Sequence, residues 1–252
     1  MRPGLAHSLP PHTARHVLGM LTVLVVLATV GGRAQAHAVN ASAPPAQPQQ
    51  EIVLLTQPHE VVTRTGEQRA ERLTLSISRP ITGVRTALPV IGRRVTPAGV
   101  ALLHVMLPGR PNGSQGWIRQ EATIAEPSAW SIIVHTATRR IHVYRNRVLA
   151  RSLEAIVGKQ STPTPHGQFF VEESVRMPPG ADGGPYALAL SAHSDVFTEF
   201  DGGDGQVAIH GMANLSGAPG TASSHGCVRL AARDLTWLVA RIRPGVRVTI
   251  AS

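Results

Sequence analysis

The sequence predicts a mainly β protein: a small β-barrel, then a larger β-rich domain with one or more short helices. Short runs of β-branched and aromatic residues recur along the chain, and Gly, Pro and Asn separate them as turn residues. Only one segment, 234–242, repeats its apolar residues with the spacing of a helix. With 252 residues, 42% of them hydrophobic and 15% charged, the chain is neither a disordered polymer nor a multispanning membrane protein.

The first 38 residues have the features of a secretory signal. Arg2 and Arg15 precede an uncharged apolar run at 17–30, and Ala34-Gln35-Ala36 offers a cleavage site. The run also fits an uncleaved membrane anchor, although it is shorter than the ~20 residues that span a bilayer comfortably. We therefore expect residues 1–38 to direct export to the cell-wall space, with the protein secreted or anchored to the outer face of the cytoplasmic membrane. Residues 39–50, rich in Ala, Pro and Gln, are expected to be an extended linker.

Residues 51–125 are predicted to form the small β-barrel. Tight turns at Pro108-Gly109 and Pro111-Asn112-Gly113 separate the last of its β-like runs, which span 52–55, 73–77, 87–91, 100–107 and 116–118. The segment 87–119, with its LPGRPNG and GWI stretches, resembles the small SH3-like domain that precedes the catalytic domain in many secreted actinobacterial cell-wall enzymes. The resemblance implies either a wall-binding module or a spacer that packs on the second domain.

Residues 129–252 are predicted to form the second domain, because Glu126-Pro127 interrupts the β pattern just before it. Arg145-Asn146-Arg147 is typical of a hairpin turn between two β-like runs. After the predicted helix, Pro244-Gly245 marks a stop, and alternating apolar residues then predict a final strand. The β-like runs of this part span 132–134, 141–144, 148–149, 169–171 and 246–250.

The charge balance favours an anionic partner. The chain has 24 Lys and Arg residues against 15 Asp and Glu residues, which gives a formal net charge of +9. Cell-wall polymer, a membrane surface and nucleic acid all fit that sign. Because the arginines are scattered along the chain, we expect no nucleic-acid partner.

The chemistry is predicted to lie in residues 208–230, AIHGMANLSGAPGTASSHGCVRL. Cys227 is the only cysteine, so the chain forms no intramolecular disulfide. A thiol nucleophile needs a base and oxyanion donors: His210 and His225 are both candidate bases, and the backbone N–H groups of Gly226 and Cys227 are candidate donors. Two alternatives remain. One is a buried structural cysteine, which the Ser and Gly neighbours disfavour; the other is a zinc site of both histidines and the cysteine, with no fourth carboxylate nearby in sequence.

These residues resemble the L,D-transpeptidase catalytic domain, the YkuD-type fold of bacterial cell-wall enzymes. The family motif is a His and a spacer, then Ser/Thr-His-Gly-Cys, a hydrophobic residue and Arg or Asn. Here His210-Gly211 precedes Ser224-His225-Gly226-Cys227-Val228-Arg229, with fifteen residues from the first histidine to the second. Segments at 130–144, 157–167 and 190–194 resemble other parts of the domain, so the likeness covers about residues 130–250.

The resemblance implies catalytic roles for four residues. His210 is the base that pairs with the nucleophile Cys227, and the Gly211 carbonyl helps to orient the imidazole ring. Backbone N–H groups around Gly226 and Cys227 hold the oxyanion. No metal and no cofactor are implied.

Four further residues are implied to bind substrate. Arg229 is expected to contact an anionic group, which a guanidinium suits because it donates two parallel hydrogen bonds. Ser224 and His225 shape the loop beside the substrate. Tyr186, next to the loop 177–185, is expected to form one wall of the substrate cleft.

The activity that the resemblance implies is an acyl transfer in peptidoglycan. Stem peptides are the expected partners: the thiol takes the acyl group of a tetrapeptide stem as a thioester, releases D-alanine, and passes the acyl group to a second stem as a 3→3 cross-link. Carbapenem β-lactams are expected to acylate the same sulfur. Water as the acceptor would make the protein an L,D-carboxypeptidase. A non-catalytic peptidoglycan-binding protein is the alternative of another class, against which the intact His–Cys pair argues.

Overall fold

The computed structural model describes residues 50–65, 69–199 and 203–252. The predicted signal or anchor, and all of the predicted linker except Gln50, lie outside these ranges. The described residues belong to one unit of the chain, Ala43–Ser252. Among them, no helix is long and apolar enough to cross a membrane.

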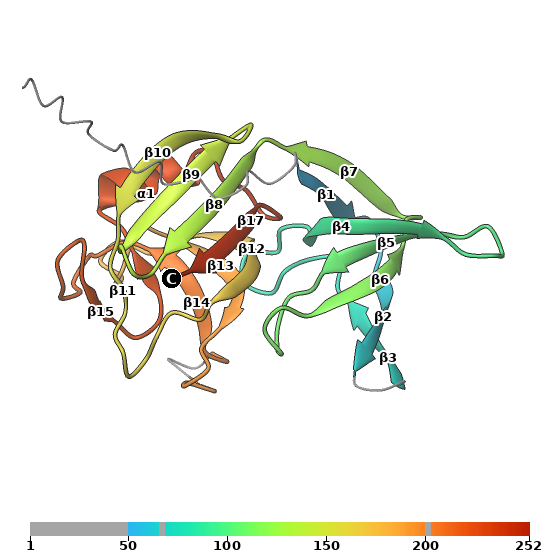
Figure 1. The fold of residues 1–252 in the computed structure, drawn as a ribbon, viewed down its shortest axis with the longest axis horizontal. Coiled ribbons are helices and arrows are strands. Elements are labelled where there is room, and N and C mark those ends of the chain that lie inside the picture. The colour runs from blue at the N-terminus through green and yellow to red at the C-terminus, as the bar shows by residue number, and fades with distance from the viewer. Residues whose placement is uncertain (1–49, 66–68, 200–202) are drawn as a thin grey trace, which may run out of the picture. The chain divides into compact units, whose positions relative to one another are not determined.

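The first part of the chain forms a seven-stranded sheet with the order β3-β2-β6-β5-β4-β1-β7 (Figure 1). Its core is made by the inward-facing residues of alternating strands, such as Val53 and Leu55 on β1 and Leu103 and Val105 on β5. The strands are β1 (Gln50–Leu55), β2 (His59–Thr65), β3 (Arg69–Leu75), β4 (Ala87–Val95), β5 (Ala101–Met106), β6 (Gln115–Arg119) and β7 (Thr123–Ser128).

Two strands of this sheet differ from the sequence prediction. Strand β2, HEVVTRT, is largely polar and was not among the expected β-like runs. Strand β7 runs through Glu126-Pro127, the predicted interruption. Proline lacks a backbone N–H, and β7 tolerates it because this strand lies at the edge of the sheet and pairs only with β1. The division into domains at this point and the SH3-like resemblance stay predictions.

The second part forms an eight-stranded sheet with the order β10-β9-β8-β17-β12-β13-β14-β16, beside a small parallel pair of β11 and β15. The predicted hairpin turn joins β9 to β10, with Asn146 and Arg147 at φ values of 49° and 69°, as a two-residue hairpin turn requires. The strands are β8 (Trp130–His135), β9 (Arg140–Arg145), β10 (Val148–Glu154), β11 (Val157–Gly158), β12 (Gly167–Arg176), β13 (Tyr186–His193), β14 (Gln206–His210), β15 (Ala222–Ser224), β16 (Val228–Arg229) and β17 (Arg247–Ala251).

The predicted helix is present as α1 (Ala232–Val239), the α-helix of the described residues. Leu235 and Leu238 are fully buried in the core of the second sheet, as the apolar spacing predicts. The helix begins two residues before the predicted segment and ends three residues earlier. The N–H of Ile242 still donates to the Leu238 carbonyl at 2.9 Å, so the last predicted turn survives as a separate turn.

The cores of the two sheets exchange residues. Ile52 on β1 and Ala87 on β4 pack in the core of the second sheet, whereas Phe170 on β12 packs in the core of the first. A Cβ atom at Gly245 would lie 2.4 Å from Ile52 Cγ2, so only a glycine lets the isoleucine seat there. An ion pair between Arg79 and Glu172 also links the sheets; burial raises the pKa of Glu172 to about 7, and the Arg79 charge opposes that rise.

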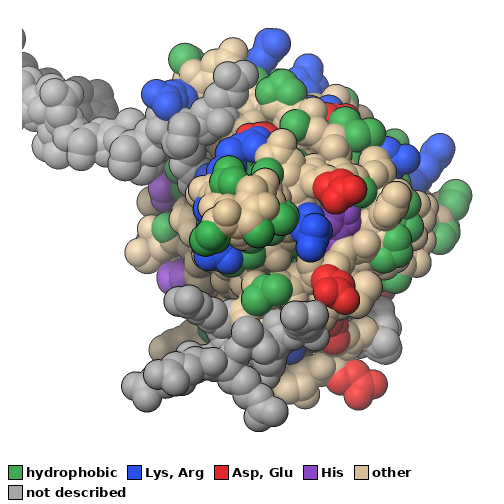
Figure 2. Space-filling view, turned by 90° about the vertical axis from the view of Figure 1, so that its right-hand side faces the viewer, with side chains coloured by type: hydrophobic (Ala, Val, Ile, Leu, Met, Phe, Trp, Pro, Cys, Tyr) green, Lys and Arg blue, Asp and Glu red, His purple; other side chains and the backbone are tan. Residues whose placement is uncertain are grey.

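Basic side chains are spread over the surface. On the face shown in Figure 2, Lys and Arg side chains stand among hydrophobic and uncharged ones. Several are in exposed ion pairs, such as Arg243 with Glu126 and Arg140 with Glu154, which contribute little to stability.

Candidate active site

The two catalytic candidates of the sequence lie on one pair of neighbouring parallel strands. His210 is the last residue of β14, and Cys227 immediately precedes β16. The strands pair in the register Ile209 with Val228 and His210 with Arg229. Because side chains alternate between the two faces of a strand, this register puts His210, Cys227 and Arg229 on one face and the fully buried Ile209 and Val228 on the other.

That face opens into a cavity of about 800 Å³. Cys227, His210, Arg229 and His225 all line it. The volume falls in the range of small-molecule and substrate sites in proteins. The remaining lining residues used below are Ser194, Phe197, Gly205 and Gln206.

The surroundings of Cys227 favour the neutral thiol. Burial raises the pKa of Cys227, while the Ala208 N–H, which donates to Sγ at 3.4 Å, and the Arg229 charge both act to lower it. A thiol in this state needs a base at the moment of attack.

His210 is held as such a base. Its Nδ1 lies 2.9 Å from the carbonyl oxygen of Gly211. A carbonyl can only accept, so Nδ1 carries the ring proton and Nε2 keeps its lone pair in the neutral ring. Burial lowers the pKa of His210, opposed by hydrogen bonds with the backbone of Gly211 and Gly183. The neutral imidazole that a general base requires is therefore the favoured form.

Gly183 packs against the His210 ring, a contact that sequence reasoning missed. A Cβ atom at Gly183 would lie 2.4 Å from His210 Nδ1. The Gly183 carbonyl also accepts the Gly211 N–H at 2.6 Å, and its own N–H donates to the Ala213 carbonyl at 2.8 Å. The loop at 177–185 is thus the wall that fixes the base; its Gly-Gly-Pro stretch is the only sequence signal of that close approach.

Ser224 and Gly226 shape the turn that carries the thiol. Ser224 is fully buried, its hydroxyl donates to the Cys227 carbonyl at 2.5 Å, and it accepts the Gly226 N–H at 3.2 Å. Gly226 has a φ of 120°, a conformation that L side chains rarely adopt. The Gly226 N–H is therefore occupied by Ser224, and the backbone N–H of Cys227 remains the oxyanion donor to consider. Ser224 supports the loop from within rather than facing the cavity.

The neighbouring segment 162–164 holds this turn through hydrogen bonds, and we call it the clamp. Thr164 donates its hydroxyl proton to the Gly226 carbonyl at 2.8 Å and accepts the Gly158 N–H at 2.9 Å. Thr162 donates to the Ser224 carbonyl at 3.2 Å. The Thr-Pro-Thr-Pro stretch thus holds the turn before the nucleophile.

Arg229 lines the cavity with a largely buried guanidinium. The residue is 8% exposed, and its Nη1 donates to the Ser216 carbonyl at 2.9 Å. Its Nε is buried and has no hydrogen-bond partner. A buried guanidinium with a spare N–H is suited to an anionic ligand group.

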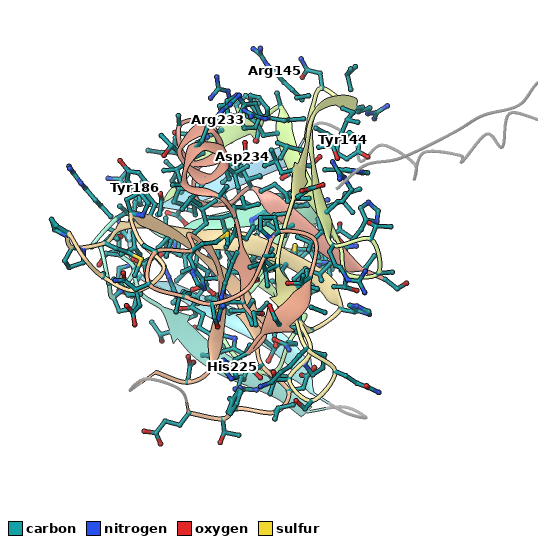
Figure 3. All side chains as sticks on the ribbon, turned by 90° about the vertical axis from the view of Figure 1, so that its left-hand side faces the viewer. Tyr144, Arg145, Tyr186, His225, Arg233 and Asp234 are labelled. Atoms are coloured by element: carbon teal, nitrogen blue, oxygen red, sulfur yellow. The ribbon has the colours of Figure 1, made fainter. Side chains whose placement is uncertain are left out.

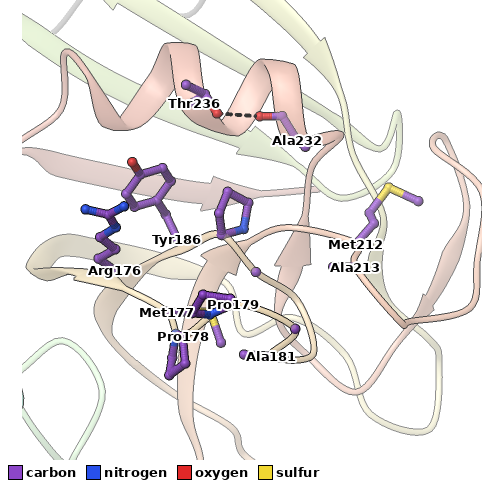
Figure 4. Close-up of a pocket in the computed structure, with 13 residues that line it drawn as sticks. Arg176, Met177, Pro178, Pro179, Ala181, Tyr186, Met212, Ala213, Ala232 and Thr236 are labelled. Atoms are coloured by element: carbon purple, nitrogen blue, oxygen red, sulfur yellow. Dashed lines mark hydrogen bonds between the residues drawn. The ribbon is translucent and has the colours of Figure 1, made fainter.

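The structure separates the two remaining substrate-binding candidates. His225 lines the cavity of Cys227, where its Nε2 lies 3.3 Å from Lys159 Nζ and its ring meets that of Phe197 edge-on. Tyr186 lies well apart from His225 (Figure 3) and lines a second cavity of about 940 Å³ with Arg176, Pro185 and Met212 (Figure 4). Met177 lines both cavities, so the loop at 177–185 is the partition between them.

No metal cluster takes in these residues: over the described ranges, no group of three or more His, Cys, Asp or Glu side chains is placed to hold an ion. His193 and His166, two further histidines of the matched segments, do not line the cavity of Cys227. His193 is buried with its Nε2 2.9 Å from Asp204 Oδ2, and His166 bonds Thr136 near the surface.

The second part of the chain is similar to known proteins. Residues 129–250 match the YkuD family, described as the L,D-transpeptidase catalytic domain. A Bacillus licheniformis protein named as an L,D-transpeptidase YkuD is 33% identical over 122 residues, which cover 48% of this chain and 65% of that relative. A Bacillus subtilis (strain 168) protein of the same name is 32% identical over 146 residues, covering 58% of this chain and 73% of the relative. Among solved structures, L,D-transpeptidase 3 from Mycobacterium tuberculosis, in complex with a faropenem-derived adduct, overlaps 66% of this chain and 91% of its own, at 16% identity and a TM-score of 0.41.

Proposed function

Since the chain belongs to the L,D-transpeptidase family, with its catalytic domain at residues 129–250, we propose that it forms 3→3 peptidoglycan cross-links through a thioester on Cys227. The observation that carries this proposal is the register of β14 and β16, which delivers a thiol, an imidazole and a guanidinium to one cavity. Nucleophile, base and anion-binding group are the parts that acyl transfer requires.

In the first half-reaction, His210 Nε2 takes the thiol proton as Sγ attacks the carbonyl before the terminal D-alanine of a tetrapeptide stem. The C–S bond forms and the carbonyl oxygen becomes an oxyanion. The imidazolium then gives its proton to the amide nitrogen, the C–N bond breaks, and D-alanine leaves. The stem stays on the enzyme as a thioester.

The second half-reaction reverses these roles. The neutral side-chain amine of a second stem attacks the thioester, and His210 accepts a proton from the amine as the new C–N bond forms. The C–S bond breaks, and the sulfur recovers its proton from the imidazolium. No redox partner is consumed.

Two groups would stabilise charge on this path. The Cys227 backbone N–H would donate to the oxyanion, a contribution typically worth about 3 kcal/mol in related sites. Arg229, which lines the cavity, would pair its guanidinium with a carboxylate of the stem.

The site of action proposed for this chemistry is outside the cytoplasmic membrane, where peptidoglycan lies. The support is the N-terminal pattern of basic residues, apolar run and small-residue cleavage motif.

Incubating the full-length protein with a carbapenem, and separately with a disaccharide-tetrapeptide, tests the proposal. We expect a covalent drug adduct, release of D-alanine and a dimeric product by mass spectrometry, all absent in Cys227→Ala. Release of D-alanine without a dimer would instead assign an L,D-carboxypeptidase. A folded wild-type protein with neither adduct nor turnover would overturn the enzymatic assignment.

A further inference from the structure

One turn of the first sheet reaches across to the wall of the active-site cavity. The turn joins β5 to β6 and contains the Arg110-Pro111-Asn112-Gly113 stretch. The Nη2 group of Arg110 lies 2.8 Å from the Ser194 carbonyl, 3.0 Å from the Phe197 carbonyl and 3.1 Å from the Asp204 carbonyl. A single guanidinium nitrogen thus lies within hydrogen-bond distance of three carbonyl oxygens in the connection between β13 and β14.

Asn112 fixes the start of the same connection. Its Nδ2 donates to the His193 carbonyl at 2.7 Å, and its Oδ1 accepts the His193 N–H at 2.8 Å. The side chain therefore bonds His193 as a neighbouring strand would, at the point where β13 ends. Nδ2 also lies 3.2 Å from Asp195 Oδ1.

The bonded segment is a wall of the cavity that holds Cys227. Ser194, Phe197 and Gly205 all line that cavity. The Ser194 hydroxyl accepts the Phe197 N–H at 3.0 Å, and the Ser194 N–H donates to the Gly205 carbonyl at 2.8 Å. These bonds hold the two ends of the connection between β13 and β14 together. The Arg110 guanidinium binds carbonyl groups from both ends.

The fit around the guanidinium is close. Gly205 has a φ of 75°, and a Cβ atom there would lie 2.1 Å from the Phe197 carbonyl oxygen and 3.3 Å from Arg110 Nη2. Three carbonyl dipoles that converge in this way repel one another unless a cation neutralises them. Arg110 is exposed as a residue, so it contributes little to the core.

We propose that Arg110 and Asn112 are positioning residues for the active site, and that through them the first sheet holds part of the cavity wall in place. The inference rests on the proposed function only in taking this cavity as the site of acyl transfer. The LPGRPNG stretch then has a role beyond binding the cell wall or acting as a spacer. It holds the side of the cavity on which Phe197 faces His225.

Arg243 offers a matched control. Like Arg110 it is exposed and donates from Nη2 to a backbone carbonyl of the other sheet, that of Pro127 at 2.8 Å. It does not line the cavity of Cys227. Arg243→Ala therefore removes a comparable link between the sheets at a place where the wall is not involved.

The test compares full-length Arg110→Ala, Arg110→Lys, Asn112→Ala and Arg243→Ala. A wall displaced by about 1 Å costs up to ~100-fold in rate, so we expect Arg110→Ala to slow carbapenem acylation and to lower kcat/KM for the tetrapeptide about 10-fold, mainly through KM. Alkylation of Cys227 by iodoacetamide, which is too small to need the wall, should stay within about twofold of wild type. Arg110→Lys should recover part of the loss because it returns a cation, Asn112→Ala should lose less than Arg110→Ala, and Arg243→Ala should match wild type.

Hydrogen exchange of the peptide covering Ser194 to Gln206 gives a readout that does not depend on turnover. We expect faster exchange there in Arg110→Ala than in Arg243→Ala or wild type. If wild type neither reacts with the drug nor turns over, the proposed function fails while this readout still decides the positioning role. Unchanged exchange and unchanged acylation in a folded Arg110→Ala protein, or equal effects of Arg243→Ala, would overturn the inference.

Discussion

The strand that carries His210 and the loop that carries His225 hold the same imidazole ring in opposite surroundings. His210 is enclosed by Gly183 and bonds a carbonyl through Nδ1, so Nε2 is left as a base. His225 faces Lys159, whose ammonium can only donate, so its Nε2 accepts a hydrogen bond from the lysine and is not left to take a proton from the thiol. Both rings line one cavity and both sit close to Cys227 in the motif. The neighbours of each ring, more than its distance along the chain, decide which histidine can act as the base.

Replacing each histidine in turn with asparagine is expected to give the largest difference between the two rings. His210→Asn should lower the rate of carbapenem acylation by about 10²- to 10⁴-fold, the usual contribution of a general base. His225→Asn should lower it by less than about 10-fold, because that ring shapes the cavity without moving the proton. Stopped-flow acylation, with far-UV circular dichroism as the folding control, measures both. Equal losses would mean that the two histidines act as a unit.

The glycine beside His210 gives a second, smaller test. Gly183→Ala places a methyl group against Nδ1 and should lower kcat/KM about 10- to 100-fold by turning the ring. Gly180→Ala is the matched control: its φ of 81° resembles the 75° of Gly183, but a Cβ atom there meets nothing within 4 Å. Both variants should lose similar stability in thermal melts. Similar activities would show that the ring contact does not matter.

The pH dependence of acylation sharpens the comparison further. Burial lowers the pKa of His210, so the neutral base persists below the ordinary range of a histidine. Acylation should hold its plateau as pH falls through about 6.5, the usual histidine pKa, and decline only at lower pH. His225→Asn should leave this acidic limb in place. A limb at the ordinary histidine value, or one lost in His225→Asn, would reassign the base.

The smallest effect on activity is expected from a substitution in the clamp at 162–164. Thr164→Val keeps the shape but leaves the Gly226 carbonyl and the Gly158 N–H without their partner, which should lower the free energy of unfolding by about 1–3 kcal/mol. Activity should fall only a few-fold, since neither imidazole is touched. Thr136→Val, at an exposed bond to His166, is the control, with denaturant titration as the measurement. A loss as large as that of His210→Asn would place the clamp in the catalytic machinery.

The sequence could predict the parts of this site that are local in the chain. Cys227, His210 and Arg229 belong to one short motif, and the alternation of apolar residues predicts most strands. Spacing alone left two candidate bases, because Gly183 beside His210 and Lys159 beside His225, which distinguish them, come from other segments of the chain. The polar strand β2 and the proline-bearing edge strand β7 were missed because sheet partners, rather than local propensity, stabilise them.

Contacts between distant segments account for the rest. The Gly-Gly-Pro stretch of the loop at 177–185 does not identify His210 as the side chain that Gly183 touches, and nothing near Tyr186 shows that a partition separates it from Cys227. The Ser224 hydroxyl could bind a ligand by its chemistry, but it is already hydrogen-bonded to the backbone of Gly226 and Cys227 in its own turn. The reach of Arg110 to the cavity wall spans more than 80 residues of sequence and follows only from the packing of the two sheets.

The exchange of core residues between the two sheets bears on how the molecule melts. Ile52 rests on Gly245, and Phe170 is buried among residues of the first sheet, so neither sheet can open without exposing apolar surface of the other. Cooperativity of this kind should make calorimetry record one heat-absorption peak for the two sheets instead of two. A protein whose thiol site depends on both sheets then loses its activity and its fold at the same temperature, with no long-lived, half-melted form that exposes the thiol.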